Sequence, residues 1–181
     1  MLCFKDPVKS CILQLVFARS TDDIDVLHVA HKIKVGEEAL FKALKELEKE
    51  EVILIHRKEG KVIFRANLYA PVFLRWKRLY NMNMIYDSGL VDYLIKEYDN
   101  PDAIVLIGSM STGKDKKESD IDIVIVTDKQ RDLNLGPYQK HLARSIQLFH
   151  VNLKTARPEI INTLANGFVL YGYLNIASLL Q

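Results

Sequence analysis

An apolar run that stops abruptly at a glycine and a serine constrains this chain more than any other stretch. Residues 103–107 are continuously apolar, and Gly108 and Ser109 follow at once. A second apolar run begins after Asp120 and carries Asp122 near its start. Continuous apolar runs of this length are typical of strands buried on both faces. Because side chains alternate across a strand, both carboxylates are expected on the same face.

Two carboxylates on one face repel each other unless a cation lies between them. Oxygen ligation of this kind suits Mg²⁺, which takes one or two carboxylates and completes its shell with water and phosphate oxygens. Gly108 allows a tight turn, and the Ser109 hydroxyl with nearby N–H groups can hold phosphate oxygens. Either half of the pattern alone is more often structural. Together they predict a site for a metal-bound triphosphate.

The same pattern continues between the two predicted strands. It reads Gly-Ser-x-x-x-Gly, five residues, then Ser-Asp-x-Asp, and it resembles the signature of the DNA polymerase beta-like nucleotidyltransferase superfamily, in particular its minimal nucleotidyltransferases. The matching positions are Gly108, Ser109, Gly113, Ser119, Asp120 and Asp122. The resemblance covers about the C-terminal half of the chain. It implies a small α/β (α+β) domain with a mixed sheet over residues 88–181.

The resemblance also implies roles for these residues. Asp120 and Asp122 would bind Mg²⁺ or Mn²⁺, and they would be catalytic together with Ser109. The nucleotide would be bound by Gly108, Ser109, Gly113 and Ser119. The substrate would be a nucleoside triphosphate whose nucleoside monophosphate passes to an acceptor that the sequence does not identify. We interpret residues 114–118 as a solvated loop of mixed charge.

The third carboxylate of the superfamily is missing from this sequence. Active members usually carry it on the strand predicted here at residues 145–153, where the register points to Gln147. Glutamine cannot act as a base or balance a second Mg²⁺. His150 could substitute as a base but is expected on the opposite face of the strand. Thr112 is a smaller departure, at a position where arginine is frequent. Catalytic activity is therefore the favoured interpretation but an open one.

Residues 1–70 predict three short helices followed by a β-hairpin. The first helix begins at Pro7 and ends near Arg19, and the second begins within residues 20–23 and runs to about Lys32. The third has an apolar stripe of Leu40, Ala43, Leu44 and Leu47. Two strands, 52–55 and 62–66, are joined by a turn over 57–61. This order resembles a winged helix-turn-helix domain.

A winged helix would place its third helix in a DNA major groove and its hairpin on the flanking phosphates. The candidate nucleic-acid-binding residues are Arg57, Lys58 and Lys61 on the hairpin, with Lys42 and Lys45 on the third helix. Residues 1–86 carry 15 basic and 11 acidic side chains, a net charge of +4. Acidic residues on the third helix match its basic ones. DNA, RNA and a protein partner therefore all stay open.

Residues 71–87 predict a connecting helix that is rich in aromatic and other large apolar side chains. These groups exceed the needs of a plain linker. They would either pack between the two domains or form a homodimer seam over residues 71–86, and the sequence leaves both open. The next helix is predicted to be capped by Ser88.

Composition sets outer limits on the function. Of 181 residues, 49% are hydrophobic and 27% are charged, which argues against global disorder. No apolar run approaches the ~20 residues that span a bilayer. The N-terminus lacks the features of a signal peptide, and only two cysteines occur, so a cytoplasmic location with no membrane partner is expected.

Two hypotheses follow, from different classes. In the first, the chain is a metal-dependent nucleotidyltransferase whose winged helix binds nucleic acid or a partner. In the second, it is a DNA-binding transcriptional regulator whose nucleotidyltransferase-like domain binds nucleotide but is catalytically weak or inactive. The intact glycine, serine and aspartate pattern favours the first. The glutamine at position 147 favours the second.

Overall fold

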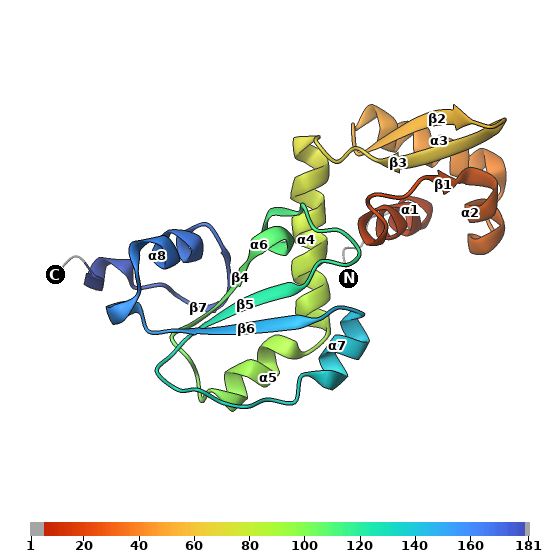
Figure 1. Cartoon of the computed structure of the whole chain (residues 1–181). Helices are drawn as coiled ribbons and strands as arrows, with labels where there is room; N and C mark the ends of the chain where they lie inside the picture. Colours follow the sequence, from red (N-terminus) through yellow and green to blue (C-terminus); the bar gives the residue numbers. More distant parts are fainter. Residues whose placement is uncertain (1–5, 180–181) are drawn as a thin grey trace. The chain divides into compact units, whose positions relative to one another are not determined.

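The computed structural model describes residues 6–179 and divides into two compact units at the bond between Tyr80 and Asn81 (Figure 1). This division falls inside helix α4 (Pro71–Asp87), which was predicted over 71–87. The three-part division into 1–70, 71–87 and 88–181 stays a prediction. The first five residues, which carry most of the argument against a leader, lie outside the described residues. Among the described residues, no helix is long and apolar enough to cross a membrane.

Unit 1 contains the predicted three helices and β-hairpin. The helices are α1 (Pro7–Ala18), α2 (Val26–Ile33) and α3 (Glu37–Lys49), and the strands are β1 (Ile24–Asp25), β2 (Ile53–Lys58) and β3 (Lys61–Ala66). The three strands form an antiparallel sheet in the order β1-β3-β2. Asp6 accepts hydrogen bonds from the first turn of α1, and Pro7 takes the first helical position, where its missing N–H costs nothing.

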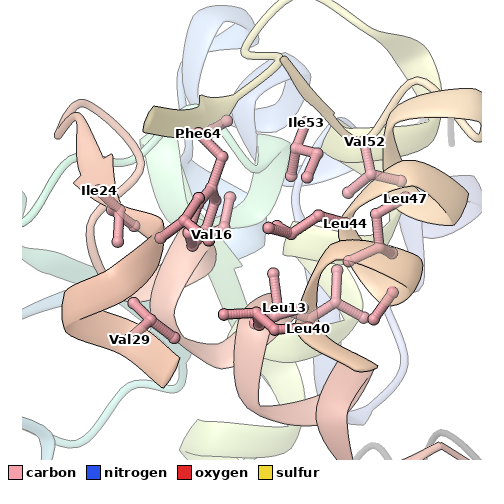
Figure 2. Packing of buried hydrophobic residues seen from close by; sticks show 14 of the residues in the cluster. Leu13, Val16, Ile24, Val29, Leu40, Leu44, Leu47, Val52, Ile53 and Phe64 are labelled. Atoms are coloured by element: carbon pink, nitrogen blue, oxygen red, sulfur yellow. The ribbon is translucent and has the colours of Figure 1, made fainter. Parts of the chain in front are cut away.

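The core of unit 1 lies between the helices and the sheet (Figure 2). All four apolar positions predicted for α3 are buried: Leu40, Ala43, Leu44 and Leu47. They pack with Leu13 and Val16 of α1 and with Phe64 of β3. The period of 3.6 residues identified this face correctly, because the exposed face of α3 is almost entirely charged.

Two local predictions in unit 1 were wrong. Residues 20–23 do not cap α2. Asp25 does, accepting hydrogen bonds from the N–H groups of Leu27 and His28, and the two-residue strand β1 precedes it. The hairpin turn consists of Glu59 and Gly60 alone, both with positive φ, so the predicted turn over 57–61 was too long. Each miss involves a segment too short to show a hydrophobic period.

Helix α4 contributes side chains to both cores. Phe73 is fully buried in the core of unit 1, and Trp76 and Tyr80 pack against it, whereas Ile85 is fully buried in the core of unit 2. Lys77 is also buried and donates a hydrogen bond to the carbonyl oxygen of Phe17. Much of the apolar content of α4 is thus used within the two units. A homodimer through residues 71–86 stays a prediction.

Unit 2 is a four-stranded mixed sheet with helices on both faces (Figure 1). The strand order is β6-β5-β4-β7; β5 and β6 are parallel, and the other pairs are antiparallel. The mixed α/β class predicted from the sequence is confirmed. The elements after α4 are α5 (Leu90–Glu97), β4 (Ala103–Ile107), α6 (Gly108–Thr112), β5 (Ile121–Val126), α7 (Gly136–Leu142), β6 (Ile146–Val151), η1 (Leu153–Thr155), α8 (Pro158–Ala165), β7 (Phe168–Gly172) and η2 (Ile176–Leu179).

The two central strands, β4 and β5, are buried on both faces, as their apolar sequences predict. Ile104 and Ile123 pack on the face shared with α5 and α7, and Val105 and Val124 pack on the face that carries Leu164 of α8. Alternation therefore divides β5 into an isoleucine face and a valine face. Asp122 belongs by parity to the valine face.

One helix start in unit 2 differs from the prediction. The N-cap of α5 is Gly89, with φ +75°, although the neighbouring Ser88 hydroxyl oxygen accepts a hydrogen bond from the N–H of Leu90 at 3.2 Å. Helix α8 begins at Pro158, directly after its N-cap residue Arg157, and the preceding 3-10 turn ends at Thr155. A polar residue near a helix start is a weak guide to the cap when several polar residues adjoin.

Gly172 is expected to tolerate no side chain. Its φ is +70°, and an alanine Cβ would overlap the carbonyl oxygen of Asp102. We expect Gly172→Ala to destabilise the protein by at least about 3 kcal/mol in urea unfolding. Gly89→Ala is the matched control, because Gly89 has φ +75° but open space around it. Its cost should be about 1–2 kcal/mol. If both variants lose the same free energy of unfolding, backbone strain and not the contact with Asp102 accounts for the cost of a side chain at position 172.

Candidate functional site

Asp120 and Asp122 lie at the beginning of β5, beside the bend that follows β4. The antiparallel register pairs Asp122 with Ile107, the last residue of β4. The parallel register pairs the same Asp122 with Gln147 of β6. The side-chain amide of Gln147 donates to Asp120 Oδ2 at 2.5 Å. The structure therefore brings both acids and Gln147 together on one face of the sheet.

The two carboxylates repel each other at this point of the sheet. Burial raises the pKa of the Asp122 carboxyl above its ordinary value of 3.8, and the charge of Asp120 raises it further. No group of three or more His, Cys, Asp or Glu side chains within residues 6–179 could hold a metal ion. A cation bound between the two aspartates would therefore need further oxygens from water or from a ligand.

Gly108 leaves room for the Asp122 carboxylate. An alanine Cβ at position 108 would lie 2.6 Å from Asp122 Oδ2, and φ at Gly108 is +71°. Both the close approach and the backbone conformation require glycine. The chain then enters the five-residue helix α6, which ends at Gly113 with φ +74°. The Asp122 carboxylate thus occupies the space beside Gly108, and Asp120 lies two residues before it. Two neighbouring carboxylates are ligands that Mg²⁺ accepts.

The hydroxyl side chains near the bend have different environments. Ser109 is half-buried near the start of α6, directly after Gly108. The Ser119 hydroxyl oxygen accepts a hydrogen bond from the N–H of Lys116 at 2.9 Å, so it closes a turn within the loop before Asp120. Thr112 donates its hydroxyl hydrogen within α6, to carbonyl oxygens including that of Ser109 at 3.0 Å.

His150 is not available to replace the missing carboxylate. Its ring nitrogen Nε2 lies 2.5 Å from the hydroxyl oxygen of Tyr98, a buried side chain of the isoleucine face. Gln147, three residues earlier on β6, reaches the acids on the other face. The alternation of β6 thus separates these side chains, as predicted.

The interpretation of residues 114–118 as a solvated loop was wrong for one residue. The Asp115 side chain has no exposed surface and pairs with Arg144, whose Nη2 lies 3.0 Å from Asp115 Oδ2. Asn81 donates from Nδ2 to Asp115 Oδ1 at 2.7 Å. Sequence reasoning missed all three residues, because a lone aspartate between lysines, an arginine before a strand and an asparagine in a helix carry no distinctive pattern.

The candidate nucleic-acid-binding residues are all exposed, but two of them are paired with acids. Lys58 lies 3.0 Å from Asp23, and Lys61 lies 3.6 Å from Asp25. The hydrogen bond from Lys58 lowers the pKa of the Asp23 carboxyl. Arg57, Lys42 and Lys45 are exposed as well. The basic hairpin predicted from the sequence is therefore partly neutralised by acids that precede α2.

A cavity of about 360 Å³ lies elsewhere in unit 2, at the opposite end of β5. Asp102, Thr127, Asp128 and Lys154 are among its lining residues. Six strand residues separate it from Asp120, roughly 20 Å. Its lining offers side chains of both charges and no bend like that at Gly108. We therefore place the candidate site at the start of β5 and not in this cavity.

Comparison with known proteins bears on the class of unit 2. Residues 90–173 match the family model described as Polymerase beta, Nucleotidyltransferase, which supports the nucleotidyltransferase superfamily for the segment that carries the site. No curated protein matches the chain. Among solved structures, a mutant of Lactococcus lactis ZitR is similar, with 18% identity and a TM-score of 0.36 over 54% of this chain and 68% of that one. A likeness of that size carries no functional information.

Asp122→Asn is expected to stabilise the metal-free protein. Because the pKa of Asp122 is raised above 3.8 by folding, the folded state binds its proton more tightly than the unfolded state. The folded protein therefore loses stability as the pH rises from the ordinary pKa of 3.8 through the raised pKa of folded Asp122. The uncharged asparagine side chain does not titrate, so the variant avoids this loss. At pH 7 without divalent ions we expect a melting temperature about 1–3 °C above wild type. The difference should vanish below the ordinary pKa of 3.8. A lower melting temperature at pH 7 would contradict the reasoning.

Proposed function

We propose that unit 2 binds a nucleoside triphosphate with a divalent cation and transfers its nucleoside monophosphate to an acceptor. One observation carries the proposal: two mutually repelling acids lie on one sheet face, directly beside the glycine bend with which α6 begins. The match of residues 90–173 to the nucleotidyltransferase family model supports it.

Each residue has a role in this proposal. Asp120 and Asp122 would hold Mg²⁺ or Mn²⁺, which when bound neutralises charge on the phosphates and on the departing pyrophosphate. Ser109 would donate its hydroxyl hydrogen to a phosphate oxygen, and the backbone from Gly108 to Gly113 would approach the triphosphate closely. Gly108, which has no side chain, would let the Asp122 carboxylate lie directly against the bend that approaches the triphosphate. Ser119 would act by shaping the loop before Asp120.

Gln147 limits the chemistry that the site can perform with its own side chains. Its amide donates to Asp120 and therefore occupies one carboxylate lone pair, while supplying no negative charge for a second cation. It also cannot take a proton from the acceptor. The proposed reaction thus suits an acceptor that is already a good nucleophile, or one that brings its own base.

Asp120→Ala is expected to abolish both nucleotide binding and transfer. The test incubates the full chain with each α-labelled nucleoside triphosphate and Mn²⁺, with DNA, RNA and the protein itself as acceptors. Wild type should bind at least one nucleotide in a metal-dependent manner and yield labelled product; Asp120→Ala should lose both, because one carboxylate holds the cation weakly.

Asp128→Ala is the matched control, since Asp128 is an exposed aspartate at the other end of β5. It should behave as wild type. Metal-independent binding, or binding that survives Asp120→Ala, would refute the proposal. Binding without transfer, together with salt-sensitive retardation of DNA, would select the second candidate below.

A second candidate function is a regulator that binds nucleotide without transferring it. The hydrogen bond from Gln147 to Asp120 favours this candidate, because it replaces the third carboxylate with a neutral donor. Here unit 1 would act as a winged helix-turn-helix that contacts nucleic acid through Arg57, Lys58, Lys61, Lys42 and Lys45. Its three helices and three-stranded sheet are compatible with that role.

Gln147→Asp is expected to raise the transfer rate. Residue 147 lies opposite Asp122 in the register, so a carboxylate there would face the same site and add the missing charge and base. Groups of this kind contribute on the order of 10²–10⁴ in rate. Gln147→Glu is the control for length. An unchanged rate in Gln147→Asp, with cation binding intact, would show that position 147 does not limit the chemistry.

A further inference from the structure

Arg144 holds the loop that leads into Asp120. Its Nη1 donates to the carbonyl oxygen of Lys116 at 2.6 Å and to that of Ser119 at 2.8 Å, while Nη2 pairs with Asp115. Ser119 is the residue directly before Asp120. The N–H of Ile121, directly after it, donates to the carbonyl oxygen of Ser145, the neighbour of Arg144. The backbone on both sides of Asp120 is therefore fixed to one short segment before β6.

The same network reaches the bend on the other side of the site. Asp115 accepts a hydrogen bond from Asn81 at 2.7 Å, and the same amide nitrogen donates to the carbonyl oxygen of Met110 in α6 at 3.0 Å. A chain of polar contacts thus runs from α6 through Asn81, Asp115 and Arg144 to the carbonyl group before Asp120. It links the element proposed to meet phosphate to the residue proposed to hold the cation.

Burial makes these contacts strong and specific. The Arg144 side chain is 8% exposed and the Asp115 side chain 0%. Charged groups removed from water need their partners, and a guanidinium can donate to several acceptors in a fixed plane. By contrast, the pair between Lys129 and Asp99 is about half-exposed or more on both sides and is expected to contribute little.

We propose that Arg144 is a positioning residue that fixes Asp120, through the loop 114–119, in the geometry that binds a divalent cation. The part of this inference that concerns the cation rests on the proposed function. The part that concerns how Arg144 holds the loop does not. Groups that orient metal ligands from behind change metal affinity by about 10–100-fold when removed.

The test compares three single variants of the full chain. Arg144→Lys keeps a positive charge for Asp115, but one ammonium cannot reproduce the planar set of bonds to both carbonyl oxygens. Asp115→Asn keeps the two carbonyl oxygens that Arg144 Nη1 reaches and an acceptor oxygen for Asn81. It removes the negative charge and the second acceptor oxygen, to which Arg144 Nη2 donates. Lys129→Gln removes an exposed ion pair away from the site and should match wild type throughout.

Two measurements separate positioning from general stability. Mn²⁺ alone, titrated and followed by the electron paramagnetic resonance of the free ion, should bind Arg144→Lys about tenfold more weakly than wild type. Hydrogen exchange of the amides in residues 116–121 should become faster in the same variant, while exchange in α5 is unchanged. Asp115→Asn should retain Mn²⁺ affinity better than Arg144→Lys, whatever its melting temperature.

Wild-type Mn²⁺ affinity and wild-type loop exchange in Arg144→Lys would overturn the inference. So would losses of affinity in both site variants that simply follow their melting temperatures. Should wild type bind Mn²⁺ without dependence on Asp120, the proposed function fails. The exchange measurement still judges the role of Arg144 in that case, because it needs no bound ion.

Discussion

Repulsion between two carboxylates on one face of a buried sheet is the constraint on which unit 2 depends. The neighbours of Asp122 along β5 are apolar and buried, so this strand cannot shift to separate the charges. What can adjust is the surrounding structure. Gly108 leaves space beside Asp122, Gln147 supplies a neutral donor to Asp120, and Arg144 holds the loop before it. These features fix the positions of the two acids, but none of them supplies a positive charge between the carboxylates, so the repulsion remains.

The sequence was a good guide to the regular elements and to the position of the acids. The runs at 103–107 and 121–126 are long and almost uniformly apolar, so strands buried on both faces could be inferred without knowing their partners. Alternation then placed Asp120 and Asp122 together and separated Gln147 from His150. Such inferences need only the period of a strand, which is a local property.

The rest depended on contacts between residues far apart in the chain. Asp115 looks like one charge among several in a polar loop, but it is buried because it contacts Asn81, 34 positions away, and Arg144, 29 positions away. The strand β1 has two residues and exists because it pairs with β3. Neither a buried ion pair nor a two-residue strand has a sequence period, so the roles of Asp115, Arg144 and Asn81 could not be predicted.

The parallel pairing of β5 with β6 has a consequence for how the site forms. Strands β4 and β5 pair antiparallel across a short connection, whereas β6 must return alongside β5 after the crossover through α7. Non-local parallel pairing is slow compared with local contacts. Gln147 and Arg144 both arrive with β6. Until then Asp120 and Asp122 face water, where their charges cost little, so we expect the electrostatic strain of the site to arise when β6 docks and not when β4 and β5 first pair.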